Sequence, residues 1–230
     1  MTVHISKLLR FEGYGSRNPG KMFFIGLEER SPDGDLANLE ARSAFPCDRM
    51  DMRLASELLF GDGWWGETKM KRVRVWQVAA RIRMALDGDE ANWRTERDER
   101  LGRSNGDTLL TELLPIPRNI GDNPWPKHYR AALGFADYDH YVDAVLADRL
   151  DLLRSMLERH KPEYVFCYGI TSCKIFEALF PRTSFTPDEV QAGGRQQRFL
   201  HGCSDSTVIV ITNHYSGSKR PFTSGFVGPL

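Results

Sequence analysis

Four short apolar runs, separated by segments with helical spacing, constrain the fold of this chain most strongly. The runs cover residues 21–29, 108–117, 162–171 and 205–218. Each is apolar on both faces, which is typical of strands covered on both sides of a parallel sheet. The intervening segments 51–60, 73–86 and 137–160 have apolar residues at helical spacing. The pattern predicts an α/β fold, namely a three-layer α/β/α domain over residues 1–230 with a mostly parallel central sheet of about four strands.

Polar and small residues lie within or after the later part of these runs, and we expect them to meet at one edge of the sheet, because ligands of parallel sheets bind outside the carboxyl ends of the strands. They are Glu28 and Glu29, Glu112, residues 169–171 and residues 213–219. Glu112 is the unusual one, since it interrupts the apolar segment TLLTELLPIPRN (108–119). A carboxylate in an apolar setting is costly unless it is paired or protonated. Glu112 therefore either points to solvent, pairs with an arginine such as Arg118, or faces a pocket and binds a ligand.

Composition excludes several classes of protein. The chain has 31 basic and 31 acidic residues and no apolar run of about 18 residues, and its N-terminus lacks the pattern of a signal peptide. We therefore expect a cytoplasmic protein without a membrane partner. The four cysteines form no C-x-x-C pair, and no glycine-rich phosphate-binding motif occurs, so no metal and no cofactor are expected. Residues 69–83 carry six basic and no acidic side chains, which form either a phosphate-binding surface or a solvated helix face.

Five segments carry a resemblance to a known family when taken in order. They are FFIGLEE (23–29), ARSAFP (41–46), LLTELLPIPR (109–118), KPEYVFCYGITSCKIF (161–176) and VIVITNHYSGSKRPF (208–222). Together they resemble the motifs of the uracil-DNA glycosylase superfamily. The sequence departs from that family in three places, because Glu29 and Tyr215 replace prolines and Glu112 stands where the family has an asparagine. These departures place the chain outside the standard branches that excise uracil.

The resemblance implies a role for each matching residue. Glu28 and His214 would be catalytic, with Glu29 competing for the role of Glu28. The base would be bound by Gly26, Phe45 and Glu112. The DNA backbone would be contacted by Ser216, Ser218, Lys219 and Arg220. The alternatives are a salt-bridged loop glutamate at position 28 and a core phenylalanine at position 45. Trp64 and Trp65 have no assigned role beyond a pocket wall or a DNA contact.

The resemblance further implies a monofunctional DNA glycosylase, which flips a nucleotide and hydrolyses its N-glycosidic bond to leave an abasic site. A carboxylate at position 112 accepts from the N4 amine of cytosine and is repelled by O4 of uracil; if protonated, it also donates to N3. Excision of ordinary cytosine would destroy the host genome, so we expect a modified, 5-substituted cytosine, such as a glucosylated one, in foreign or phage DNA.

Three alternatives remain at this stage. The first is a uracil or mismatch DNA glycosylase of base-excision repair, with Glu112 turned away from the pocket. The second is a catalytically silent binder of modified DNA. The third, a doubly wound enzyme acting on a small molecule, lacks a nucleotide-binding motif. DNA is the expected partner, and no obligate protein partner is expected.

Overall fold

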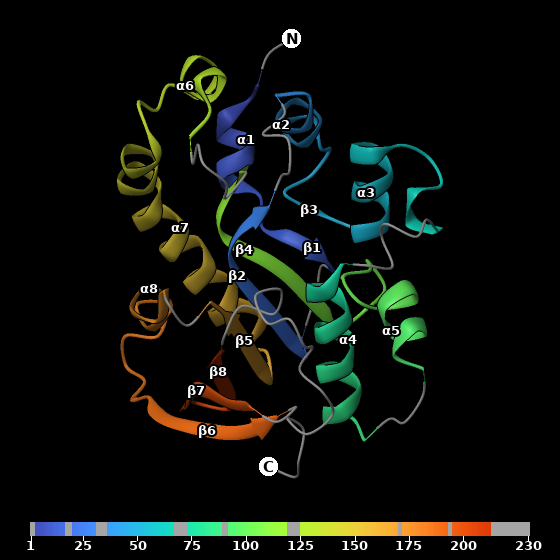
Figure 1. Ribbon diagram of the computed structural model, residues 1–230, viewed down its shortest axis with the longest axis vertical. Coiled ribbons are helices and arrows are strands. Elements are labelled where there is room, and N and C mark those ends of the chain that lie inside the picture. The colour runs from blue at the N-terminus through green and yellow to red at the C-terminus, as the bar shows by residue number, and fades with distance from the viewer. Residues whose placement is uncertain are drawn as a thin grey trace.

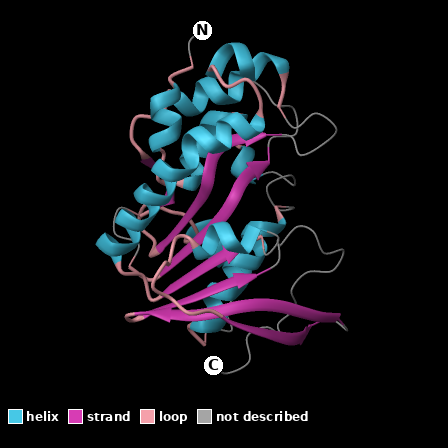
Figure 2. Ribbon diagram, turned by 90° about the vertical axis from the view of Figure 1, so that its left-hand side faces the viewer, coloured by secondary structure: helices cyan, strands magenta, loops and turns pink. Residues whose placement is uncertain are grey.

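The computed structural model describes residues 3–16, 20–30, 36–66, 73–88, 92–118, 125–169, 172–192 and 195–212. Its centre is one eight-stranded sheet with the strand order β3-β1-β4-β2-β5-β8-β7-β6. Helices lie against this sheet along its length, and the strands form one twisted layer in Figure 2. The predicted α/β class is therefore confirmed.

The four predicted runs form the middle of the sheet. They are β4 (Thr108–Arg118), β2 (Met22–Arg30), β5 (Tyr164–Tyr168) and β8 (Thr207–Thr212), and these neighbours pair in parallel. Their carboxyl ends therefore lie at the same edge, as the sequence predicts.

The expectation of about four mostly parallel strands was wrong, because the sheet is mixed and has twice that number. Strand β1 (Gly13–Gly15) pairs antiparallel with β4 and parallel with β3 (Arg49–Met50). At the other edge, β6 (Thr186–Ala192) and β7 (Arg195–Ser204) form an antiparallel hairpin on β8. The first pair is too short to give an apolar run, and the hairpin is largely polar and exposed, so neither has the signature of a buried strand.

The described helices surround the sheet and its carboxyl edge (Figure 1). They are α1 (Ile5–Arg10), α2 (Leu36–Ser43), α3 (Met52–Phe60), α4 (Arg74–Leu86), α5 (Trp93–Glu99), α6 (Lys127–Leu133), α7 (Tyr138–His160) and α8 (Cys173–Glu177), with a 3-10 turn η1 (Trp64–Gly66) after α3. The helical segments predicted at 51–60, 73–86 and 137–160 correspond to α3, α4 and α7. Within the described ranges, no helix is both long and apolar enough to cross a membrane.

Alternate residues of the central strands pack into two separate cores. On one face, Phe24, Leu110 and Phe166 pack with Val78 and Ile82 of α4. The opposite face carries a second core, made by Phe23, Ile25, Val165, Cys167 and Ile209 of the strands with Leu153 and Met156 of α7 and Phe176 of α8. Burial on both faces explains why the four runs are apolar throughout.

Candidate functional site

An open cavity of about 620 Å³ lies at the carboxyl ends of β2 and β5 and beside the first half of β4. This volume is in the range of sites that bind small molecules or single nucleosides. Its walls come from the three strands, from β1, α3 and η1, and from the start of α4. The lining residues are Tyr14, Glu28, Glu29, Met52, Ser56, Leu59, Phe60, Trp64, Val73, Arg74, Val75, Trp76, Leu110, Thr111, Glu112 and Tyr168.

Glu112 and Tyr168 meet above the strand that separates them. Gly26 of β2 pairs with Glu112 on one side and with Tyr168 on the other, so the three residues form one row across the sheet. The Tyr168 hydroxyl donates a hydrogen bond to Glu112 Oε1 at 2.8 Å. A Cβ atom on Gly26 would lie 1.9 Å from Glu112 Oε2 and 2.6 Å from Tyr168 Cε2. The contact between the two side chains therefore requires glycine at position 26.

The surroundings of the Glu112 carboxyl group favour its protonated form at neutral pH. Burial raises its pKa to about 8, and the nearby carboxylates of Glu29 and Glu28 add to this effect, while the hydrogen bond from Tyr168 and the charge of Arg42 oppose it. Glu112 Oε2 is buried and has no hydrogen-bond partner among the residues that the structure describes. The sequence left three alternatives for Glu112, namely solvent, an arginine partner or a pocket, and in the structure its side chain lines a pocket. No described arginine forms an ion pair with its carboxyl group, and the side chain of Arg118 lies outside the described residues.

The two adjacent glutamates at the end of β2 have different partners. Glu29 is held by Arg42 of α2 through two hydrogen bonds, of 2.8 and 2.9 Å, and accepts a third from Tyr14. Such a bidentate pair with a buried arginine fixes the carboxylate in place. Glu28 is 8% exposed, lines the cavity and accepts a hydrogen bond of 3.1 Å from Tyr138 at the start of α7. Glu28 is therefore the better candidate for a reacting carboxylate, since Glu29 is committed to Arg42.

Aromatic rings form the wall opposite the strands. Trp64 stacks on Phe60, with centroids 4.7 Å apart, and lies edge-on to Trp76 at 6.0 Å. All three line the cavity. Phe60 is 49% exposed, which places an apolar ring at the rim. A wall of this kind suits a planar heterocycle, because aromatic rings stack on any base.

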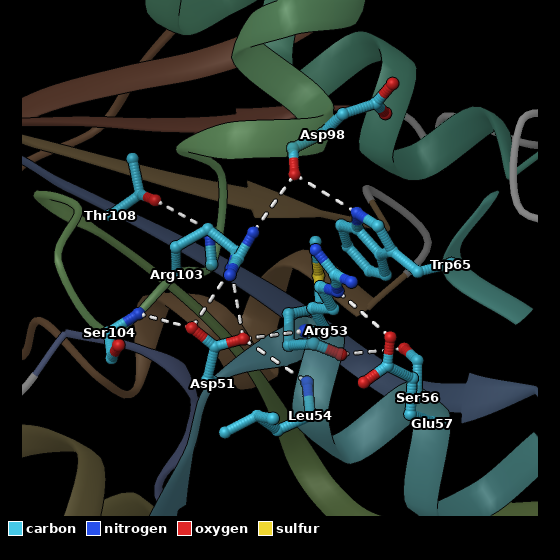
Figure 3. A network of polar contacts seen from close by, with 12 residues as sticks. Asp51, Arg53, Leu54, Ser56, Glu57, Trp65, Asp98, Arg103, Ser104 and Thr108 are labelled. Carbon is cyan, nitrogen blue, oxygen red and sulfur yellow. Dashed lines mark hydrogen bonds and ion pairs between the residues drawn. The ribbon is translucent and has the colours of Figure 1, made fainter. Parts of the chain in front are cut away.

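A polar network fixes this wall to the body of the protein (Figure 3). Asp51 caps α3 by accepting from the backbone N–H groups of Arg53 and Leu54, and it also accepts from Arg103 Nε. Arg103 and the indole of Trp65 both donate to the carbonyl of Asp98, each at 3.1 Å. The network thus joins α3, η1 and the segment before β4.

The ionisation of Asp51 supports the same network. Burial alone would raise the pKa of Asp51, but the hydrogen bonds from the Ser104 N–H and from Arg103, together with the charge of Arg103, lower it below its usual value. A charged Asp51 is the form that caps the helix most effectively.

The structure brings only some of the predicted site residues together. Glu28, Glu29 and Glu112 line the cavity, and Gly26 lies against the Glu112 carboxyl group. Phe45, in contrast, is 5% exposed and packs in a small core against Phe11, with centroids 5.6 Å apart, and it does not line the cavity. This is the core position that the sequence left as the alternative to stacking. The other predicted site residues lie outside the described residues; they are His214, Ser216, Ser218, Lys219 and Arg220.

Sequence reasoning missed most of the residues that line the cavity, among them Tyr168, Phe60 and Trp76. Tyr168 could have been found only from the register, because it is adjacent to Glu112 in space and 56 positions away in sequence. For Trp64 the sequence left a pocket wall or a DNA contact open, and in the structure it lines the cavity.

Similarity to known proteins adds no family assignment to this geometry. The chain matches no protein-family model, no curated protein and no solved structure. Its functional interpretation therefore depends on the residues and the geometry described above.

Proposed function

We propose that the protein is a DNA glycosylase that flips a pyrimidine nucleotide into this cavity and hydrolyses its N-glycosidic bond. The proposed substrate is a modified, 5-substituted cytosine, such as a glucosylated one, in foreign DNA. The observation that carries the proposal is the carboxyl group of Glu112, which Tyr168 holds in a cavity of nucleoside size with an aromatic wall and whose pKa burial raises to about 8. The order of motifs along the sequence supports it independently.

A neutral carboxylic acid matches the Watson–Crick edge of cytosine. Tyr168 donates to Oε1, which marks Oε1 as the acceptor and leaves the proton on Oε2. The Oε2 hydroxyl can then donate to N3 of the base, while the second lone pair of Oε1 accepts from the N4 amine. Because Oε2 lies over Gly26 in the structure, base binding requires the carboxyl group to turn toward the cavity.

The same groups suggest how the bond breaks. As the C1′–N1 bond opens, its electron pair goes to the base, and the Glu112 proton moves to N3, so that the base leaves neutral rather than as an anion. Water adds to C1′ and gives its proton to Glu28, whose negative charge also stabilises the positive charge that develops on the sugar. Glu112 ends as a carboxylate and Glu28 as an acid, and exchange with solvent restores both.

The raised pKa of Glu112 also keeps one alternative open. A neutral acid can pair with uracil as well, by accepting from N3–H and donating to O4. A uracil glycosylase of base-excision repair is therefore the second candidate function.

Duplex oligonucleotides that differ in one base test the proposal. Each duplex carries a single uracil, cytosine, 5-hydroxymethylcytosine or glucosylated 5-hydroxymethylcytosine, and abasic sites are revealed by strand scission in hot alkali. We expect scission at a modified cytosine only. Scission at uracil only would establish the repair alternative. Binding of the modified duplex by the protein without scission would establish the silent binder. Glu28→Gln should abolish scission and keep binding, whereas Glu99→Gln, at the exposed end of α5, should change neither.

A further inference from the structure

An arginine-flanked tryptophan on α4 and α5 is not used by the proposed chemistry. Trp93, the first residue of α5, is half-buried. The guanidinium group of Arg81 from α4 lies 4.5 Å from the centroid of its ring, and that of Arg94 lies 4.6 Å from it. Both arginines are exposed. Such cation–π contacts hold two long side chains in fixed positions while leaving their charges toward solvent.

Among the described residues, these two arginines differ from Arg83, Arg97 and Arg100 in having no acidic partner. Arg83 pairs with Asp107 at 2.8 Å, Arg97 with Asp98 at 2.5 Å and Arg100 with Glu96 at 3.8 Å. Neither Arg81 nor Arg94 forms an ion pair with any carboxylate in the part of the chain that the structure describes. The basic excess of residues 69–83 is therefore not all neutralised, even though the whole chain has no net charge.

The arginines of α4 lead from the cavity toward Trp93. Arg74, the first residue of α4, lines the cavity, and Arg81 follows seven residues later, two turns along the same face of the helix. At 1.5 Å per residue the two positions are about 10 Å apart along the helix. One strand of DNA presents a phosphate about every 3.4 Å of its axis, so this distance corresponds to roughly three phosphates. Helices α4 and α5 pack side by side (Figure 1), which continues the row of cations to Arg94.

We infer that Arg81 and Arg94, held on Trp93, bind the phosphate backbone of the DNA strand whose nucleotide enters the cavity. This inference rests on the proposed function, because it takes the cavity as the destination of the flipped nucleotide. Arginine suits the task, since its planar guanidinium group binds phosphate through two parallel hydrogen bonds. Contacts of this kind position the protein on DNA without reading sequence.

Salt dependence of DNA binding tests the inference. The affinity for an unmodified and for a modified 20-base-pair duplex is measured by fluorescence anisotropy between 50 and 200 mM salt, on the full chain. Loss of one phosphate contact lowers the slope of log K against log salt by about 0.9. We therefore expect a drop of about 0.9 for Arg81→Gln and for Arg94→Gln and of about 1.8 for the double variant, equal on both duplexes. The matched control is Arg10→Gln on α1, which removes one exposed charge elsewhere and should leave the slope unchanged.

The possible outcomes separate this inference from the proposed function. If the slope of log K against log salt in the double variant equals that of the wild type, the inference is overturned, whether or not the protein excises a base. An arginine-dependent slope without excision of any base supports the inference and counts against the glycosylase. If Arg81 and Arg94 contribute as much to the binding of poly-glutamate as to the binding of DNA, the partner is an acidic protein, and the inference is also overturned. Circular dichroism of each variant shows whether the fold is retained, and Trp93→Ala, which keeps both charges but frees them, should weaken binding less than the double variant.

Discussion

Replacing Gly26 by alanine is the sharpest test of how the candidate site is built. Its φ does not lie in the left-handed region, so the backbone itself accepts alanine. The obstacle is space, since the new Cβ would lie 1.9 Å from Glu112 Oε2 and 2.6 Å from both Glu112 Cδ and Tyr168 Cε2. Tyr168 is 3% exposed and has little room to move. The Glu112 carboxyl group must therefore turn away and lose the hydrogen bond from Tyr168.

The expected cost follows from these contacts. Forcing an extra methyl group into a packed site costs about 1–3 kcal/mol, and the lost hydrogen bond adds about 1 kcal/mol. We expect Gly26→Ala to lower the free energy of unfolding by about 2–4 kcal/mol, which is a large share of the roughly 5–15 kcal/mol of a typical domain. Gly20→Ala is the matched control, because a Cβ there meets nothing within 4 Å and its φ is ordinary. It should leave stability unchanged or raise it by up to about 1 kcal/mol.

Urea unfolding of both variants, followed by tryptophan fluorescence and by circular dichroism, gives the two free energies. If Gly26→Ala is as stable as Gly20→Ala, the carboxyl group of Glu112 does not lie over Gly26, and its burial there cannot raise its pKa.

The polar groups around the site give three further predictions. Glu112→Gln should remove a pH dependence of stability, because the folded protein holds the Glu112 proton up to a pKa of about 8, against 4.5 for the ordinary group. The wild type should therefore lose stability as pH rises from about 5 to 8, by at most about 1.4 kcal/mol per pH unit, whereas the variant should not. Urea unfolding at pH 5, 6.5 and 8 measures the difference. In the wild type, the hydrogen bond from Tyr168 lowers the pKa of Glu112, so Tyr168→Phe, which removes this bond, should raise that pKa further. Isotope-edited infrared spectra of the carboxyl group would detect the upward shift in its titration. Arg149→Met should cost about 3–5 kcal/mol in chemical unfolding, because Arg149 is 1% exposed and donates to the carbonyls of Leu9, Phe11, Glu112 and Leu113; a loss below 1 kcal/mol would show that these carbonyls find other donors.

The central part of the fold could be predicted from the sequence because burial on both faces leaves a strong local signal. The runs 21–29 and 108–117 contain strands β2 and β4 almost to the residue, and the periodicity of 137–160 gives α7. The edges could not be predicted in the same way. Strand β3 has two residues, and β6 reads TPDEVQA, which has neither an apolar run nor regular alternation. Such strands are specified by pairing with a neighbour, and pairing is not visible in one local window.

The candidate site was predictable to a smaller extent. Glu112 could be found because a carboxylate in an apolar run conflicts with its surroundings, and such conflicts mark functional positions. Its partner Tyr168 could not, because an aromatic residue in a strand looks like any core residue. Phe45 shows the converse, since its motif context suggested a ligand contact, whereas its packing against Phe11 is that of an ordinary core side chain.

The protonation of Glu112 changes where discrimination between bases must arise. A carboxylate at position 112 would repel O4 of uracil, but a neutral acid pairs with uracil and with cytosine alike. The difference then lies in the chemical step, because N3 of cytosine can take the Glu112 proton, whereas N3 of uracil already carries one. We therefore expect the Glu28→Gln variant to bind uracil-containing and modified-cytosine duplexes within a few-fold of each other, while the wild type excises only the modified cytosine, at a rate that falls as pH rises through about 8. A preference of more than a hundredfold in binding itself, about 2.7 kcal/mol, would place discrimination in recognition and remove the proton transfer from the mechanism.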